Sequence, residues 1–457
     1  MNIKRTFNKI AILSLCIVCT SNILAANLSV KPEDVIKPYI DDQTFSVIHV
    51  NLEKLNIDAC INKAIEIINQ QAEPDAAPNI QNDLKNFQTI AGTKLKELVQ
   101  AGGKDFFVVF SMYDFPYFFV AVPIRSSREA NIPNDSIQLY KHIQNIAKDF
   151  DDECFDFYAA NDLILAGLKP TIERLKTISP VQSELFAKSL QACGDTTIQA
   201  VLFPSPDQHR IFSELLPKIH FGSGMIDLTI LGKELSWAAL GFNTPPNLSW
   251  NFTIQSQNSE GADNILSFIK NIYKLVEENP KAQEFRPQLD QLLEKITPQK
   301  KENQLLLQAD SKTANSIVND FIAPSFMKVR DMANQVACAK NLSSIGKALL
   351  IYANDYEDSF PPNLELLTHL QDMPPKGLIC PSTRQKESYI YRGADLETAD
   401  DPGLILVYDK KGNHKDGRNV LFLDSHVDWL TEDKFLEFIR KDNEYRKKTH
   451  RPEIPAK

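Results

Sequence analysis

The sequence lacks the short motifs that mark the commonest enzyme and metal sites. Gly222-Ser223-Gly224 is not part of a G-x-S-x-G motif, and no HExxH motif occurs. Gly102-Gly103-Lys104 stands without the rest of a phosphate-binding loop. Beyond residue 26 no two cysteines are spaced as CxxC, which disfavours a zinc knuckle or a thioredoxin-type site. We therefore expect a non-enzymatic protein.

The sequence also has no excess of basic residues. Its 50 lysines and arginines are outnumbered by 59 aspartates and glutamates, which gives a formal net charge of -9. A nucleic-acid partner would favour a basic surface, so this balance argues against one. Hydrophobic residues make up 43% and charged residues 24%, the proportions of an ordinary folded protein. A chain of 457 residues is long enough for two or three domains.

Beyond its first residues the sequence has no apolar run long enough for a membrane helix. Residues 1–26 have the three-part layout of a secretory signal peptide. Lys4 and Arg5 precede a short apolar run from Ile10 to Thr20, and small residues end at Ala26. A buried N-terminal helix is the alternative. We expect a signal peptide, and hence an exported protein that is periplasmic or extracellular and keeps no stable membrane span.

Strand and helix patterns predict an α+β fold between residues 27 and 325. Two units, 27–185 and 186–325, each have the order β-α-β-β-α-β, for which we expect ferredoxin-like connectivity. The second unit repeats the first, because SVIHVNLEKLN corresponds to IQAVLFPSPDQ and NDLILAGLKPTIERL corresponds to NQLLLQADSKTANSI. Duplication and chance both explain these alignments.

Local signals predict where some elements begin and end. Gly102-Gly103 is expected to stop a helix, and Ser205-Pro206-Asp207 is expected to start one. A further helix is expected over residues 136–150. A hairpin is expected between strands at 225–231 and 234–242.

The last third of the sequence predicts a long helix followed by a small antiparallel sheet. The helix is expected from about Ile322 to Asp355, because core-facing residues recur at helical spacing at Leu342, Ile345, Leu349 and Tyr352. Asp424-Ser425, between the apolar runs NVLFL and HVDWL, predicts a two-residue hairpin turn. Serine at a turn position that prefers glycine costs about 1 kcal/mol.

Several separate segments of this region resemble known families. CAKNLSSIGKALLIYANDYEDSFPPNLELL, from Cys338 to Leu367, looks like the segment after the membrane helix in type II secretion pseudopilins. CPS, SYIYRG and YDKKGNHKDGRNVLFLDSHVDWL resemble the prepilin-type processing-associated H-X9-DG family. His414 and Asp424 have the family spacing, and Ser425 replaces the family's glycine. The N-terminal region is more loosely similar to uncharacterised exported regions fused to such domains.

The resemblance implies a pilin-like domain over residues 326–431, followed by a C-terminal helix and a basic tail over 432–457. We expect the basic tail from Arg440 to Lys457 to be a frayed helix end. Pseudopilins carry a lipid-facing helix at the equivalent place, whereas Lys328, Arg330 and Asp331 make this one unsuited to lipid.

These features together predict a non-enzymatic exported protein with a pseudopilin-like head. We expect it to bind or assemble with a protein of the bacterial cell envelope, or of a type II secretion-related process. A calcium-dependent binding module is one alternative. An exported hydrolase with its site in the N-terminal units is the other.

The loop DKKGNHKDG supplies the candidate metal site. Asp409, Asn413 and Asp416 offer oxygen ligands around a tight turn, which suits calcium, and major pseudopilins resemble this in placing calcium in a C-terminal loop. A solvated polar loop is the alternative. His414 and Asp424 are expected at opposite ends of a strand about 16 Å long, which argues against a shared metal. His414 is therefore interpreted as a structural hydrogen-bonding residue.

Five cysteines follow residue 26, and this odd number leaves at least one thiol free or bonded to another chain. Cys338 and Cys380 both lie in the pilin-like part. A disulfide between them would stabilise a small domain by about 3–4 kcal/mol, and export permits it. Two buried thiols are the alternative.

Overall fold

The computed structural model describes residues 32–71, 77–123, 155–160, 163–221, 224–278, 286–370 and 373–456. The chain divides into two compact units, and both regions that the sequence analysis separated at residue 185 belong to the first. The N-terminal unit comprises residues 1–65 and 84–321, and the C-terminal unit comprises residues 66–83 and 322–457. The expected signal peptide, the helix expected over 136–150 and Cys154 lie outside the described residues.

The N-terminal unit alternates strands and helices. Its described strands are β1 (Thr44–Asn51), β2 (Asp105–Ser111), β3 (Phe119–Pro123), β4 (Phe155–Ala160), β5 (Leu163–Leu168), β6 (Ile198–Leu202), β7 (Lys218–Phe221), β8 (Gly224–Asp227), β9 (Leu235–Asn243), β10 (Ser249–Ser256), β11 (Gln299–Lys301) and β12 (Gln304–Ala309). Its described helices are α2 (Pro32–Ile36), η1 (Lys37–Tyr39), α3 (Ile57–Gln71), α4 (Ala77–Gln100), α6 (Lys169–Leu175), α7 (Glu184–Ala192), α8 (Pro206–Leu215), α9 (Thr229–Glu234), α10 (Ser259–Glu277), α12 (Arg286–Ile296), α13 (Ser311–Ile317) and η2 (Val318–Ile322). The end of α3 from Glu66 and the start of α4 up to Asp83 group with the C-terminal unit.

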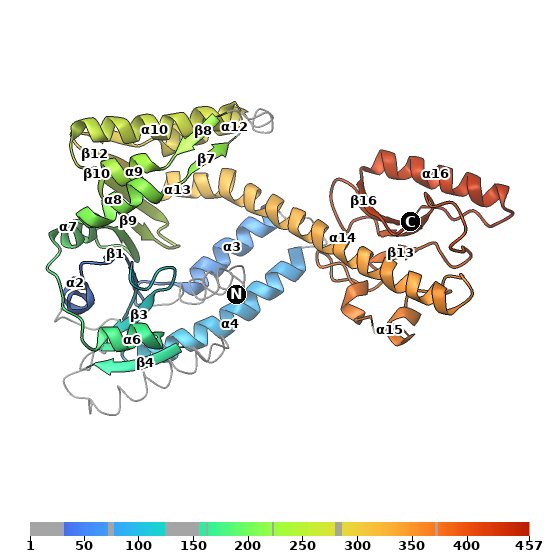
Figure 1. Cartoon of the computed structure of the whole chain (residues 1–457), viewed down its shortest axis with the longest axis horizontal. Helices are drawn as coiled ribbons and strands as arrows, with labels where there is room; N and C mark the ends of the chain where they lie inside the picture. The colour runs from blue at the N-terminus through green and yellow to red at the C-terminus, as the bar shows by residue number, and fades with distance from the viewer. Residues whose placement is uncertain are drawn as a thin grey trace. The chain divides into compact units, whose positions relative to one another are not determined.

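Ten of these strands form one sheet in the order β11-β12-β10-β9-β6-β1-β2-β3-β5-β4, part of which is labelled in Figure 1. The order repeats on either side of the antiparallel β1–β6 pair, outward as β1-β2-β3-β5-β4 and as β6-β9-β10-β12-β11. The segments aligned in the sequence occupy equivalent places, β1 with β6 and β5 with β12. The α+β class is confirmed. The duplication stays a prediction, which this repeated strand order favours.

The ferredoxin-like connectivity expected for each half is wrong. β1 pairs directly with β2, and β6 with β9, in both cases antiparallel. A single helix between two strands would leave them parallel. Here both α3 and α4 lie between β1 and β2, and the second helix reverses the chain once more.

The hairpin expected between residues 225–231 and 234–242 is also wrong. Residues Thr229–Glu234 form α9, and β8 pairs with β7 instead. Gly232, which suggested a turn, serves helix packing: a Cβ there would lie 2.5 Å from the backbone nitrogen of Ser213 in α8. Glycine thus permits the close approach of α9 to α8.

Two of the local signals are confirmed. α4 ends at Gln100, and Gly102 then adopts a φ of 96°, a conformation that favours glycine. Ser205 caps α8 by accepting a hydrogen bond from the backbone of Gln208, whose side chain bonds back to the backbone of Ser205.

Helices cover both faces of the large sheet, and its central strands are therefore buried on both sides. One face packs against α6 and α7 through a cluster that includes Val47, Phe107, Phe119, Ile172 and Leu190. The other face packs against α4 through a cluster that includes Val50, Phe106, Val120, Leu95 and Leu98. α10 covers the second half through a cluster that includes Ile254, Ile265 and Leu305.

The C-terminal unit consists of a long helix, a small sheet and a second helix. Its described elements are α14 (Ala323–Asp355), α15 (Leu366–Leu370), η3 (Pro375–Leu378), β13 (Tyr389–Tyr391), β14 (Ile405–Asp409), β15 (Arg418–Phe422), β16 (Val427–Leu430) and α16 (Glu432–Lys448). The four strands form an antiparallel sheet in chain order. The long helix and small sheet match the expectation, while kinship with pilins stays a prediction.

Neighbouring residues of β15 face two different helices. Leu421 belongs to the cluster of the α14 residues Leu342, Ile345 and Leu349. Val420 and Phe422 belong instead to the cluster of Phe435 and Ile439 in α16. α14 and α16 therefore lie on opposite faces of the sheet (Figure 1). The four residues expected to face the core from α14 are all buried.

The C-terminal tail corrects an expectation. We expected residues from Arg440 onward to fray, but α16 extends to Lys448 and the Arg446 side chain is fully buried. Arg446 Nε donates to Asp442 Oδ2 at 2.9 Å, and Nη1 donates to Asp395 Oδ1 at 2.8 Å. The buried Asp442 and the partly exposed Asp395 therefore hold a helix end that was expected to fray.

The β15–β16 hairpin turns at Asp424-Ser425 as expected, but the two-residue turn is wrong. Leu421 pairs with Val427, and the backbone nitrogen of Phe422 donates to His426 O, so the loop has three residues and ends at Ser425. Ser425 has a φ of 71°, and its backbone nitrogen donates to Phe422 O at 2.9 Å.

We expect Ser425→Gly to raise the free energy of unfolding of the C-terminal unit by about 1 kcal/mol, because glycine removes the left-handed strain. Chemical denaturation would measure this. Ser425→Ala keeps the strain and is the control; an equal gain from alanine would contradict the prediction.

Candidate functional site

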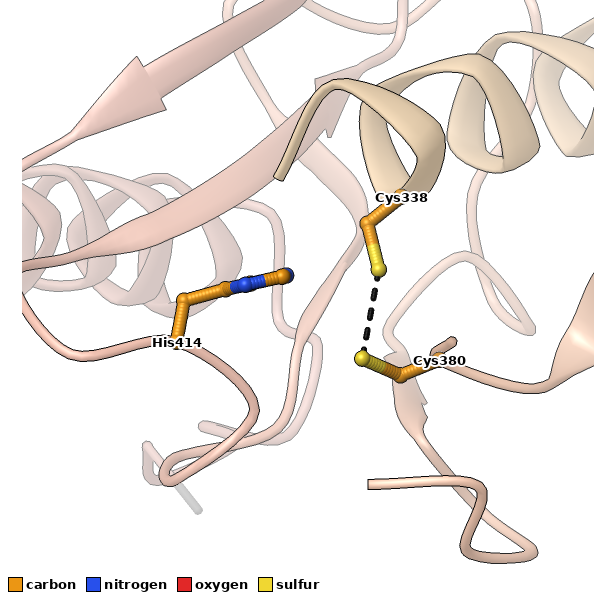
Figure 2. A group of neighbouring side chains, drawn as sticks. All are labelled: Cys338, Cys380 and His414. Atoms are coloured by element: carbon orange, nitrogen blue, oxygen red, sulfur yellow. Dashed lines mark hydrogen bonds between the residues drawn. The ribbon is translucent and has the colours of Figure 1, made fainter. Parts of the chain in front are cut away.

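Three side chains of the C-terminal unit converge on one buried point: Cys338, Cys380 and His414. Cys338 lies in α14, Cys380 follows η3, and His414 lies in the loop between β14 and β15. One sulfur or nitrogen atom from each lies within 4.8 Å of the other two. Figure 2 shows the imidazole ring of His414 directed toward the two sulfur atoms.

The two cysteines are adjacent free thiols. Their Sγ atoms are 3.3 Å apart, well beyond the bond length of about 2.05 Å in a disulfide. Both side chains are completely buried. This arrangement corresponds to the alternative of two buried thiols, while a disulfide in the oxidised protein stays a prediction.

Charge is unevenly distributed over the cluster. The thiol of Cys338 donates a hydrogen bond to Cys380, which lowers the pKa of Cys380 and raises the pKa of Cys338. Burial acts to lower the pKa of His414, but contacts with Cys380 and Asp409 outweigh burial and raise it. The cluster therefore favours a thiolate on Cys380 next to an imidazolium on His414.

Asp409 lies next to His414 at the end of β14 and is fully buried. Its Oδ2 accepts hydrogen bonds from the backbone nitrogen and Nδ2 of Asn419, at 2.9 and 2.8 Å. The same Oδ2 lies 3.4 Å from His414 Nε2, an ion-pair distance without the geometry of a hydrogen bond. Burial raises the pKa of Asp409 to about 6 against the opposing effect of His414. Within the described residues, Asp409 Oδ1 and His414 Nε2 have no hydrogen-bond partner.

Polar contacts fix the segments that carry the three residues. Asn341, in α14, donates from Nδ2 to Tyr389 Oη at 3.1 Å in β13. Asn413 donates from Nδ2 to Ser388 O at 2.7 Å and accepts at Oδ1 from Thr383 Oγ1 at 3.2 Å. The loop after Cys380 and the loop with His414 are thus joined directly, which restricts the geometry of the cluster.

A pocket of about 670 Å³ within the C-terminal unit reaches the cluster at His414. Its lining includes Asp331, Thr383, Arg418 and Trp429. The ring of Trp429 lies edge-on to that of His414, with centroids 5.8 Å apart. A small ligand or water in the pocket would therefore reach the imidazole side of the cluster.

The residues expected to bind calcium have separate roles. Asp409 bonds to Asn419, Asn413 bonds to Ser388 and Thr383, and Asp416 is exposed. No described contact joins the three. Calcium binding by this loop therefore stays a prediction without support from the geometry.

Asp424 and Ser425, the other motif residues of the resemblance, lie in the turn of the β15–β16 hairpin. Asp424 Oδ1 accepts hydrogen bonds from the backbone nitrogen of His426, at 3.1 Å, and from its Nδ1. This local contact holds the turn around Ser425. His414 precedes β15 and Asp424 follows it, so the strand separates the two residues along the chain.

The cluster was missed because sequence analysis treated its members one at a time. Cys338 opens the segment CAKNLSSIG, Cys380 opens CPS, and His414 lies in the loop that suggested calcium. The missed signal was that three of the four segments of the resemblance carry a cysteine or histidine able to bind a soft metal. Spacing rules such as CxxC detect only ligands that are close in sequence.

The N-terminal unit has its own pocket and its own buried histidine. A pocket of about 550 Å³ is lined mainly by amide and hydroxyl side chains, with Lys188 as its ionisable residue. His49 bonds to Asp105 Oδ1 at 2.9 Å and to Gln199 Oε1 at 2.8 Å, across three neighbouring strands. His49 and Asp105 are each 2% exposed and do not line that pocket, which indicates a structural network. The hydrolase alternative thus gains no support here.

Comparison of the chain with protein-family models, curated proteins and solved structures finds no match. Among helices in the described part of the chain, none combines the length and apolar character that crossing a bilayer requires. The site must therefore be interpreted from its own chemistry.

Proposed function

We propose that this chain is an exported, non-enzymatic protein that binds or assembles with another protein of the bacterial cell envelope. Its pseudopilin-like C-terminal unit is the binding part, and α14 is the element that contacts the partner. A partner in a type II secretion-related process fits the same proposal.

The observation that carries this proposal is an exposed apolar stripe on α14. Large apolar residues recur every three or four positions, from Ile322 just before the helix to Phe326, Val329, Met332 and Val336 within it, and each is between 53% and 69% exposed. Residues at this spacing lie on one face of a helix. An exposed apolar helix face of this kind on a folded protein marks an interaction site.

The C-terminal half of α14 has a different role, because it packs within its own unit. From Cys338 onward the helix packs against the small sheet through Leu342, Ile345 and Leu349. Anchoring by this half would present the stripe on a rigid helix to a partner.

The test is capture of partners from envelope extracts with the full-length exported protein as bait. We expect the double variant Val329→Glu, Val336→Glu to lose the partners that the unaltered protein retains, because charge in the centre of an apolar interface is strongly unfavourable. Mass spectrometry of the captured proteins measures the loss.

Ser344→Glu is the matched control, because Ser344 is exposed in the same helix but outside the stripe. This variant should capture the same proteins as the unaltered chain. Retention of those proteins by the stripe variant would refute α14 as the binding element.

A further inference from the structure

We propose that Cys338, Cys380 and His414 bind one zinc ion, with an exchangeable fourth position that faces the pocket. This inference goes beyond partner binding through the stripe on α14, because the three proposed zinc ligands are not among the residues of that stripe. It assigns a soft divalent cation to a part of the chain for which the sequence suggested calcium or a disulfide.

The donor set and its dimensions fit zinc. Two thiolates and an imidazole are ligands that zinc prefers. Two sulfur ligands of one tetrahedral zinc ion, each about 2.3 Å from the metal, lie about 3.8 Å apart. The two Sγ atoms are 3.3 Å apart, so a shift of a few tenths of an ångström would admit the ion. The imidazole nitrogen lies within 4.8 Å of both sulfur atoms.

The surroundings of the cluster favour a cation over an empty thiol pair. Asp409 is fully buried, and its Oδ1 and His414 Nε2 have no hydrogen-bond partner within the described residues. Buried polar atoms without partners are costly, and a carboxylate next to a metal-binding histidine commonly orients the ring. A zinc ion would compensate the buried negative charge of Asp409 and of the thiolates. Asp409 would then act as a positioning residue.

The number of ligands indicates an open site. Among the histidine, cysteine and acidic side chains of the described residues, only these three converge as a group. Structural zinc sites have four protein ligands, whereas sites with three leave a position for water or a ligand. His414 lines the pocket of about 670 Å³, so that position would be reached from the pocket.

The experiment uses the full chain, reduced and stripped of metal, with Co²⁺ as the spectroscopic probe and Zn²⁺ as the competitor. We expect a sulfur-to-cobalt charge-transfer band, tetrahedral d–d bands, and displacement of cobalt by one equivalent of zinc. Cys380→Ser and His414→Ala should each weaken zinc binding by about 100-fold or more, and Asp409→Asn should weaken it by about 10–100-fold.

Two control variants keep the cluster intact. Cys60→Ser removes a half-buried cysteine of the N-terminal unit, and His426→Ala removes an exposed histidine of the same unit as the site. Both should bind zinc like the unaltered protein. The proposal is overturned if the reduced chain gives no charge-transfer band, or if Cys380→Ser keeps full zinc affinity. Partner capture by the stripe does not involve these residues. A failure of zinc binding can therefore be told apart from a failure of partner capture.

Discussion

Replacing Asp442 by alanine is expected to lower the free energy of unfolding of the C-terminal unit by about 3–5 kcal/mol. The Asp442 carboxylate is 1% exposed and lies between Arg392 and Arg446, whose side chains are both fully buried. Its Oδ2 accepts hydrogen bonds from both guanidinium groups, and its Oδ1 accepts one from the backbone nitrogen of Ile405 at 3.1 Å. The alanine variant would leave two buried cations with less compensation and one strand amide without a partner.

Hydrogen exchange at the β14 amides, combined with chemical denaturation, measures this effect. Asp442→Asn retains an acceptor for Ile405 but loses the charge, so its loss of stability should be smaller than that of alanine. Glu437→Ala is the control, because Glu437 pairs with Lys441 at 2.8 Å on the exposed side of the same helix. Salt bridges at the surface contribute little, so this variant should unfold like the unaltered protein. An equally small effect at Asp442 would show that the buried network does not hold α16.

Periodicity and turn chemistry were sufficient to predict individual elements. α14 begins within one residue of the expected position and ends at Asp355 as expected, because its apolar spacing and the following prolines are local signals. The turn at Asp424-Ser425 and the helix stop at Gly102 follow from backbone preferences of single residues. Such features depend on interactions between neighbours in the sequence, and the sequence displays those directly.

Strand order and the site depend on distant residues, and there the predictions failed or were incomplete. One extra helix between β1 and β2 is enough to turn an expected parallel arrangement into an antiparallel one. Cys338 and Cys380, in contact across 42 residues, could be suggested as a pair only because both belonged to one small domain. His414 could not be added to them, because its place next to them depends on how the β14–β15 loop folds back toward α14.

Gly241 illustrates a requirement of the fold that no local pattern revealed. It lies in β9, between Gln199 of β6 and Asn251 of β10 in the sheet. A Cβ at this position would lie 2.1 Å from the backbone oxygen of Cys193 and 2.2 Å from Asn251 Oδ1. Asn251 Nδ2 donates to Ala192 O at 2.9 Å, at the end of α7. The glycine thus lets α7 dock on the sheet through this side chain.

We expect Gly241→Ala to lower the free energy of unfolding of the N-terminal unit by about 3 kcal/mol, the upper part of the range for overpacking, because the obstructing oxygen belongs to the backbone. Trp237 and Trp250 lie in β9 and β10, so their fluorescence during urea denaturation reports the transition.

Gly92→Ala is the matched control for the same substitution. Gly92 lies inside α4, and a Cβ there would meet nothing within 4 Å. Alanine is the better helix former, so this variant should gain up to about 1 kcal/mol. Opposite signs for the two substitutions would show that the cost at position 241 comes from the contact with α7. A loss at both positions would instead point to a general intolerance of added methyl groups and contradict that explanation.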